Sequence, residues 1–314
     1  MKHNVKITAI LLVMFLIAQF IGLYVVNQYL PEKQTIYNNQ TGEVEIVQNY
    51  SEGNKLPYGF QPDENDKPGI FSIIISFVLA VSLILFIMKY KWKFLIRIFF
   101  FFVITFALAI SINALLKNWV LSSAIIAIVL AVILSFLKIF KPHYILHNFT
   151  ELLIYPGIAP MFVVLFNWKT VIIMLILISI YDMWAVWHSG IMQKMAKFQV
   201  EEVGIFGGFF IPYLTKKVRA QIALLKKSKS KKNKKLKISL AMLGGGDIIF
   251  PIITAGVFLR EFDIFASMAI IFGAFLGLLF LFMISQKKKF YPAMPFITAG
   301  IFLGLLVWKI ASFI

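Results

Sequence analysis

The sequence contains nine long apolar segments, and this pattern constrains the fold more than any other feature. A helix needs about 20 mostly apolar residues to cross a bilayer. Hydrophobic residues make up 60% of the 314 residues, well above the share in a soluble domain. The segments are approximately 5–26, 70–88, 94–116, 119–137, 146–166, 170–188, 237–258, 264–285 and 290–312. We therefore expect an all-α membrane protein with one polytopic domain, residues 1–314, and nine transmembrane helices.

The lysines predict how these helices are oriented. Lys2 and Lys6 precede the first segment, as in a signal peptide, but its apolar run is long and no small-residue cleavage site follows. Further lysines follow the second, fourth, sixth and eighth segments, whereas residues 27–69 hold seven acids and three lysines. Lysine and arginine mark cytoplasmic loops. We expect a retained first helix, a cytoplasmic N-terminus, an external C-terminus and a multi-pass location in the cell membrane.

Two long polar segments separate the apolar ones. Residues 27–69 show little periodicity, and we expect a loosely ordered external loop. A cytoplasmic loop, about 189–236, divides spans one to six (about 5–188) from spans seven to nine (about 237–312). Eight of the twelve residues in KKSKSKKNKKLK (226–237) are lysines, which predicts a solvated segment that contacts anionic lipid headgroups. Because the sequence shows no basic folded domain, nucleic-acid binding is not expected.

Only two of the fourteen acidic residues lie well inside predicted spans, Asp182 in the sixth and Asp247 in the seventh. An ionisable group there opposes insertion by about 2.5–3.5 kcal/mol. Such groups usually face a bundle interior or a water-filled cavity and mark a functional site. At ~1.5 Å per residue, they lie ~9 and ~15 Å from the cytoplasmic ends of their helices. We expect the two carboxylates to meet; the alternative is that each bonds a neighbouring helix separately.

The stretch AMLGGGDIIFP (241–251) predicts an irregular helix around Asp247. Each glycine lowers helix propensity by up to about 1 kcal/mol, and Pro251 cannot donate a helical hydrogen bond. Small residues also let membrane helices pack closely. Local unwinding at membrane depth is tolerated only beside a cavity or neighbouring backbone, so we expect another chain to approach Asp247.

These residues form a recognisable combination. Tyr181-Asp182 resembles a YD motif, Gly244-Gly245-Gly246-Asp247 resembles a GxGD motif, and Pro292-Ala293-Met294 resembles a PAL motif, with Met in place of Leu. Motifs on the sixth, seventh and ninth spans resemble the presenilin family of GxGD intramembrane aspartyl proteases, most closely its archaeal homologues. Signal peptide peptidases share the motifs, but the resemblance implies the opposite orientation. Prepilin peptidases usually carry a lysine where this chain has Ile249.

The resemblance implies that Asp182 and Asp247 are the catalytic pair of an aspartic endopeptidase whose substrates are transmembrane helices. Two close carboxylates share one proton, so one can activate water while the other donates a proton. Tyr181 would position a carboxylate or substrate. The resemblance also assigns the glycines 244–246 to site shape, and Pro292, Ala293 and Met294 to packing around it.

One further hypothesis concerns VGIFGGFFIPYL (203–214), which is too short to span a bilayer. It could form a strand that pairs with an unwound substrate; the alternative is a membrane-surface loop packed on the bundle.

Other functions are compatible with some of these features. A cation- or proton-coupled transporter could also use two intramembrane aspartates, and an inactive descendant could bind helices only. We expect no cofactor and no metal: the chain has no cysteine and no HExxH motif, and His143 and His147 are interpreted as interface histidines. The sequence does not indicate the oligomeric state, the substrate or self-cleavage within 189–236.

Overall fold

The chain folds into long helices with two short strand pairs. The computed structural model describes residues 5–37, 44–49, 93–141, 143–189, 207–213, 239–285 and 291–312, with a few positions between 72 and 82. The helices of these residues are α1 (Val5–Asn27), α3 (Lys93–Leu116), α4 (Ser123–Phe140), α5 (Tyr144–Leu165), α6 (Trp168–Trp184), α9 (Gly245–Glu261), α10 (Ile264–Ile284) and α11 (Met294–Ala311). A π-helical turn, Ala185–Ser189, continues α6.

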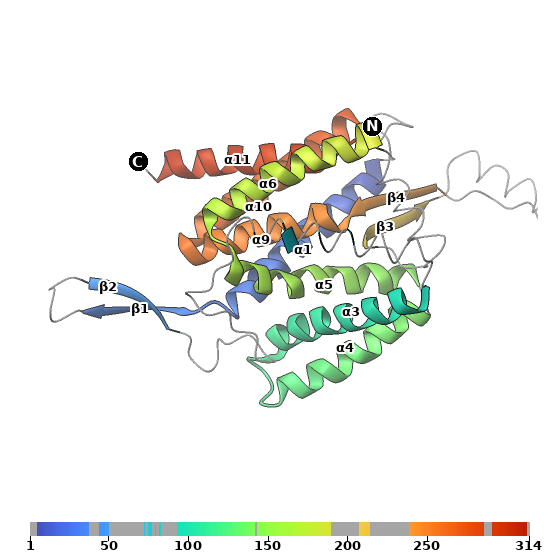
Figure 1. Ribbon diagram of the computed structural model, residues 1–314, viewed down its shortest axis with the longest axis horizontal. Helices are drawn as coiled ribbons and strands as arrows, with labels where there is room; N and C mark the ends of the chain where they lie inside the picture. The colour runs from blue at the N-terminus through green and yellow to red at the C-terminus, as the bar shows by residue number, and fades with distance from the viewer. Residues whose placement is uncertain are drawn as a thin grey trace, which may run out of the picture.

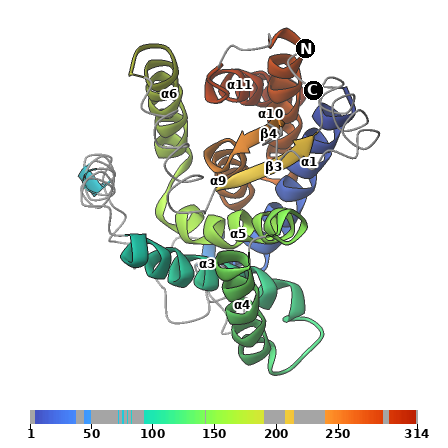
Figure 2. The ribbon, with the colours of Figure 1, turned by 90° about the vertical axis from the view of Figure 1, so that its right-hand side faces the viewer.

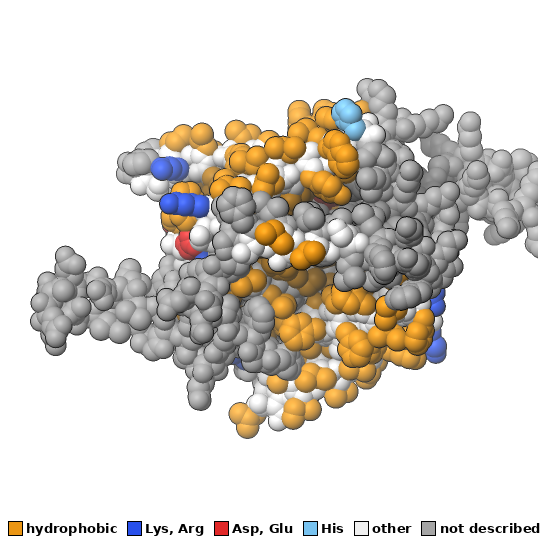
Figure 3. Space-filling model, viewed as in Figure 1, with side chains coloured by type: hydrophobic (Ala, Val, Ile, Leu, Met, Phe, Trp, Pro, Cys, Tyr) orange, Lys and Arg blue, Asp and Glu red, His pale blue; other side chains and the backbone are white. Residues whose placement is uncertain are grey.

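Seven of the described helices are long and apolar enough to cross a membrane. The eighth, α9, has 17 residues and carries Asp247 in its first turn. Figure 3 shows hydrophobic side chains over most of the described surface, with charged side chains near the ends of the helices. The all-helical membrane architecture is thus confirmed. The predicted second span, 70–88, lies mainly outside the described residues, so nine crossings and the orientation of the termini stay predictions.

The helices are arranged around a central group of α1, α5 and α9 (Figures 1 and 2). On one side of it lie α6, α10 and α11, and on the other lie α3 and α4. Glycines allow close approach within this core: a Cβ on Gly22 would meet Ile252, and one on Gly256 would meet Val163. With no hydrophobic force between helices in lipid, close packing of this kind supplies much of their association.

The strand β4 (Ser239–Gly244) corrects the predicted seventh span. Residues 237–258 were expected to be helical, but helix α9 begins only at Gly245, and β4 pairs antiparallel with β3 (Gly208–Tyr213). Successive glycines weaken the helix, while β3 supplies hydrogen bonds that satisfy the extended backbone. The estimate of ~15 Å for the depth of Asp247 assumed a helical rise throughout and therefore does not hold.

A second difference lies in the polar segment 27–69, which was expected to be loosely ordered. Its described part contains an antiparallel pair, β1 (Glu32–Tyr37) and β2 (Val44–Asn49). Both strands include β-branched or aromatic residues, in TIY and VEIV, which favour extended structure. The strand pair was not predicted because the segment is polar and shows little periodicity.

Candidate active site

Asp182 lies near the end of α6 and is 7% exposed. The backbone N–H of Met294, at the start of α11, donates a hydrogen bond to its Oδ2 at 3.1 Å. The backbone N–H of Ala293 also donates to this carboxylate. Hydrogen bonds from backbone N–H groups stabilise a carboxylate without bringing in a second charge, so the segment before α11 fixes the direction of Asp182.

Asp247 is the third residue of α9 and is 8% exposed. The backbone N–H of Gly244, the residue that caps this helix, donates to its carboxylate. Unpaired N–H groups and the helix dipole make the first turn a favourable place for a negative group. Among the described residues, both aspartates therefore depend on backbone N–H groups rather than on a basic side chain.

The two carboxylates converge because α6 and α9 are in contact at the ends that lie away from Asp182 and Asp247. The backbone N–H of Trp168, which begins α6, donates to Oε2 of Glu261, which ends α9, at 3.2 Å. The separation in sequence between Trp168 and Asp182 equals that between Asp247 and Glu261. Equal helical lengths of about 21 Å therefore bring both side chains to one level, where they lie within electrostatic range of each other. The predicted convergence agrees with this arrangement.

The three glycines before Asp247 differ in what surrounds them. A Cβ on Gly245 would lie 2.5 Å from the hydroxyl of Tyr155, and one on Gly244 would lie 3.2 Å from Oδ2 of Asp247. A Cβ on Gly246 would meet only Phe250, at an ordinary 3.6 Å. Close packing thus explains Gly245 and Gly244, whereas Gly246 is exposed and the fold leaves space above it.

The PAL-like residues lie beside Asp182, as expected, but they do more than pack. Pro292 and Met294 are buried, and the backbone of Ala293 and Met294 holds the carboxylate. Because this contact uses backbone N–H groups, Met in place of Leu at position 294 does not affect it. One turn away, the hydroxyls of Ser179 on α6 and Thr298 on α11 lie 2.8 Å apart and form a hydrogen bond.

Tyr181 is exposed, whereas the adjacent Asp182 is buried. Its side chain is 41% exposed, and its ring packs near that of Trp184 at 6.2 Å between centroids. Adjacent residues on a helix face different directions. Because Asp182 faces the protein interior, Tyr181 faces outward from α6.

Several polar residues near Asp247 were missed by the sequence analysis. Gln19 of α1 is fully buried and donates to the carbonyl of Ile248 at 3.0 Å. Tyr155 of α5 lies against Gly245. Its hydroxyl faces the carboxylate of Glu151 on the same helix, and Asp247 also lies within electrostatic range. A glutamine or tyrosine in an apolar segment is common, so spacing alone gives no signal for these two.

Asp182 and Asp247 are also not the only buried charges. Lys138 of α4 and Glu151 of α5 are 5% and 2% exposed, and Arg260 of α9 is 5% exposed. The sequence analysis considered only the acidic residues well inside predicted spans, and the predicted seventh span ended at 258, before Arg260, whereas α9 continues to Glu261. Lys138 and Glu151 pair with each other across two helices, and Arg260 pairs with its neighbour Glu261.

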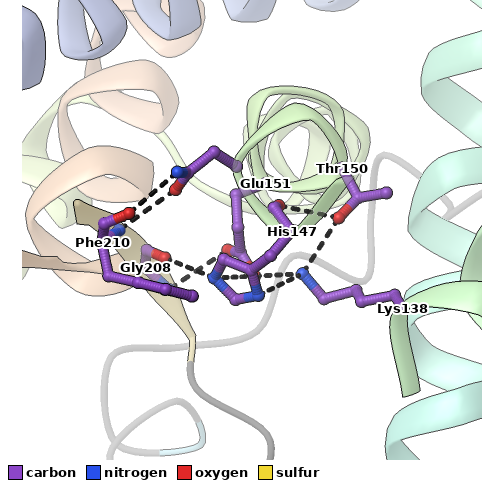
Figure 4. A network of polar contacts seen from close by, with 7 residues as sticks. Lys138, His147, Thr150, Glu151, Gly208 and Phe210 are labelled. Carbon is purple, nitrogen blue, oxygen red and sulfur yellow. Dashed lines mark hydrogen bonds and ion pairs between the residues drawn. The ribbon is translucent and has the colours of Figure 1, made fainter. Parts of the chain in front are cut away.

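The histidines at positions 143 and 147 have different surroundings. His143 is exposed and caps the helix, but His147 is 8% exposed and its Nε2 lies 2.8 Å from the carbonyl oxygen of Gly208. His147 is thus buried against other parts of the protein, and its place at the membrane interface stays a prediction. It belongs to the polar network shown in Figure 4.

The fold and the paired carboxylates define a class, the multi-pass membrane proteins with an intramembrane aspartate site, and comparison with known proteins agrees. The profile of the signal-peptide peptidase and presenilin aspartyl protease family matches residues 53–314. A structure of a presenilin family intramembrane aspartate protease in space group C222 is similar, with 17% identity, a TM-score of 0.59, and coverage of 97% of this chain and 99% of that one. A second, in space group P2, has 19% identity, a TM-score of 0.55 and 96% coverage of both chains. None of the curated proteins compared with the sequence matches it significantly.

The chain therefore belongs to the signal-peptide peptidase and presenilin family of aspartyl proteases. It is an integral, multi-pass membrane protein and an aspartic endopeptidase of the intramembrane type. The family resemblance stated from YD, GxGD and the PAL-like motif is confirmed.

Proposed function

We propose that Asp182 and Asp247 together hydrolyse a peptide bond within a transmembrane helix of a substrate protein. The observation that carries this proposal is their convergence from α6 and α9, each held by backbone N–H groups. Without a basic partner among the described residues to hold both negative, two neighbouring carboxylates favour sharing one proton. One ionised and one protonated carboxyl group are what aspartyl proteolysis requires.

The reaction then proceeds with both groups acting on one water. The ionised carboxylate takes a proton from the water, whose oxygen attacks the scissile carbonyl carbon. The protonated carboxyl hydrogen-bonds the carbonyl oxygen, and a proton passes to the leaving nitrogen as the C–N bond breaks. The pair titrates as a unit, so neither aspartate is assigned a single role. Met294 and Ala293 keep Asp182 oriented, and the exposed Tyr181 contacts substrate.

The strand pair beside Asp247 supplies a place for an unwound substrate. In an antiparallel pair, alternate residues direct both backbone groups toward the same neighbour. On β3, Gly208 and Phe210 direct theirs to side chains of α5, so Phe209 and Ile211 face β4. Pro212 falls in the set that faces α5, where its missing N–H costs no bond between β3 and β4.

The register then identifies the free edge of the sheet. Phe209 pairs with Leu243 and Ile211 with Ala241, so Leu240 and Met242 direct their backbone groups away from β3. Among the described residues, β4 pairs only with β3. The segment 203–214 was considered as a strand or a membrane-surface loop, and its described part forms β3, whose edge away from β4 is occupied by α5. The substrate strand therefore adds to β4 instead, by β-augmentation.

This placement explains the exposed glycine. The strand β4 ends at Gly244, and Asp247 lies just beyond it in the first turn of α9. A substrate strand lying along β4 passes Gly246, where a side chain would come between its backbone and the carboxylates. Main-chain pairing also suits a protease whose substrates share helical membrane segments rather than one sequence.

The test is cleavage of a model transmembrane peptide by the purified full-length protein in detergent. Wild-type protein should cut the peptide, a transition-state aspartyl inhibitor should stop the reaction, and Asp182→Ala and Asp247→Ala should each abolish it. A wild-type protein that cuts nothing, but supports ion-dependent flux in liposomes, would instead establish the transporter alternative.

A second pair of variants tests the edge of β4. Met242→Pro removes an N–H directed away from β3, so it should lower cleavage while leaving the β3–β4 ladder and thermal stability nearly intact. Ala241→Pro removes an N–H directed toward β3 and should lower both. Unchanged cleavage by Met242→Pro would disprove substrate pairing at this edge.

A further inference from the structure

Side chains of α5 occupy the edge of β3 that a third strand would otherwise take. Nε2 of His147 and Oε2 of Glu151 lie 2.8 and 3.2 Å from the carbonyl oxygen and the amide nitrogen of Gly208. Asn148 donates to the carbonyl of Phe210 at 2.8 Å and accepts from its N–H at 3.1 Å. Three residues of a helix, which we call the α5 polar cluster, thus supply the four bonds of a strand partner.

The spacing of the cluster matches the strand. His147 and Glu151 are one helical turn apart and face the same way, so both reach Gly208. Gly208 has φ of 137°, a backbone conformation that favours glycine. Substitution of this glycine would therefore strain the backbone as well as disturb its two bonds to α5.

A buried lysine anchors the cluster from the neighbouring helix. Nζ of Lys138 on α4 lies 2.5 Å from Oε1 of Glu151, 3.1 Å from the hydroxyl of Thr150 and 3.4 Å from Nδ1 of His147. Figure 4 shows the His147 ring between Gly208 and Lys138. The ammonium group has three donors, and each has a partner here, while Glu151 uses one oxygen for Lys138 and the other for β3.

These contacts fix the tautomer of His147. A carbonyl oxygen only accepts, so Nε2 must carry the hydrogen that reaches Gly208. Nδ1 is then free to accept from Lys138. The ring is held from both sides, and this orientation also places it against Phe210, with 4.6 Å between ring centroids.

Net stability alone does not explain a buried ion pair at this place. Replacing such a pair by apolar residues of similar size is often neutral or stabilising, whereas a well-bonded pair fixes geometry. The geometry fixed here is the register of β3, which continues to the candidate active site. Gly208 lies opposite Gly244, Gly207 accepts from the N–H of Gly245 at 3.3 Å, and Gly244 donates to Asp247.

We propose that His147, Asn148 and Glu151, anchored by Lys138, are positioning residues that set where along a substrate the peptide bond is cut. They hold β3, and β3 holds β4 at a fixed distance before Asp247. A substrate strand paired to β4 then presents one particular bond to the carboxylates. This inference rests on the proposed function and adds a determinant of cleavage position that lies outside the three motifs.

The test compares cleavage products by mass spectrometry, using full-length variants and one transmembrane peptide. Asn148→Leu removes both bonds to Phe210 at similar volume, and we expect cleavage to spread to neighbouring bonds with kcat reduced about tenfold. Asn148→Asp keeps the acceptor for the Phe210 N–H and should give an intermediate product pattern. If Asn148→Leu does not fold, the product pattern of Asn148→Asp decides.

A matched control separates positioning from stability. Asn113 is buried in another network, where it donates to Tyr29 and accepts from Ser123, and this network shares no residue with the α5 polar cluster. Asn113→Leu should lower thermal stability comparably and leave the cleavage positions unchanged. A product shift of equal size in this control would show that general loosening, not the α5 polar cluster, moves the cut, and would overturn the proposal.

Conservative rescue gives a second readout. The amide of His147→Gln can still donate to Gly208, so its products should resemble those of wild type, whereas His147→Leu should shift them. Wild-type positions in both His147→Leu and Asn148→Leu would overturn this proposal alone. Failure of wild-type protein to cleave, with Asp247→Ala no different, would overturn the proposed function and this inference with it.

Discussion

The two ends of α9 are built in opposite ways. At one end, Asp247 is held by a backbone N–H, and a glycine run leads into the helix. At the other, Arg260 donates to the carbonyls of Val163, Val164 and Phe166 and pairs with Glu261. The last carbonyls of a helix lack intrahelical partners, and a cation there also suits the helix dipole. Arg260 therefore joins the end of α9 to the end of α5 through several hydrogen bonds.

The contacts at the Arg260 end allow the Asp247 end of α9 to keep an irregular backbone. The Arg260 end also carries Glu261, which accepts from the start of α6 at 3.2 Å. It thereby sets the level of both Asp182 and Asp247, which lie equally far along their helices from this contact. The end that bears the chemistry can keep an exposed glycine and a strand edge that no other described strand pairs with, because alignment is fixed elsewhere.

The largest expected effect is at the reactive end. Asp247→Asn keeps the shape and an acceptor for Gly244, but it removes the shared proton, so cleavage should fall by more than about 10³-fold. Thermal stability should stay the same or rise, because a buried carboxylate is costly. Cleavage and unfolding assays on one preparation check this. Substantial residual cleavage would break the assignment of Asp247 to the chemistry.

At the opposite end the expected effect is on stability. Arg260→Met leaves three carbonyls of α5 and its C-terminal cap without their donor and should lower the free energy of unfolding by about 3–5 kcal/mol. Arg260→Lys keeps the charge but not the planar guanidinium group, so it should lower the free energy of unfolding by less than Arg260→Met does. Detergent-based thermal unfolding measures both. If Arg260→Met were as stable as wild type, the claim that this end of α9 stabilises the fold would be contradicted.

A smaller effect is expected where α6 meets α11. Thr298→Val removes the hydroxyl that pairs with Ser179 at equal size and should cost about 1 kcal/mol, with cleavage reduced several-fold as Asp182 loses alignment. Thr254→Val is the matched control, since the hydroxyl of Thr254 donates to the carbonyl of Phe250 in its own helix. Kinetics that are equal in the two variants would show that the α6–α11 bond does not align Asp182.

The glycines give the smallest and sharpest test of the reactive end. Gly245→Ala would press on Tyr155 and should lower stability by about 1–3 kcal/mol. Gly246→Ala would make only an ordinary contact with Phe250 among the described residues, so stability should be unchanged or slightly higher, while kcat/KM falls because substrate backbone passes there. Unfolding and cleavage are measured together. A Gly246→Ala variant with wild-type kinetics would place the substrate elsewhere.

The sequence predicted those parts that depend on composition and on local motifs. Apolar length located the described helices other than α9 within a few residues, and the cost of burying a charge singled out Asp182 and Asp247. The strand β4 could not be predicted, because its apolar residues resemble a helix and only β3, in a separate part of the sequence, stabilises the extended form. Contacts such as Lys138 with Glu151, or Gln19 with Ile248, depend on tertiary packing that no local pattern records.

The central claim is that the side chains of residues 182 and 247 meet in one site. The chain has no cysteine, so paired substitutions can be cross-linked without background. The double variant Asp182→Cys with Asp247→Cys should form an intramolecular link with a short thiol-reactive reagent. The control, Asp182→Cys with Asp263→Cys, places the second thiol at the start of α10, beyond the Arg260 end of α9, and should not. Efficient linking of the first pair alone is the predicted result; no linking of that pair, or equal linking of both, would contradict the account.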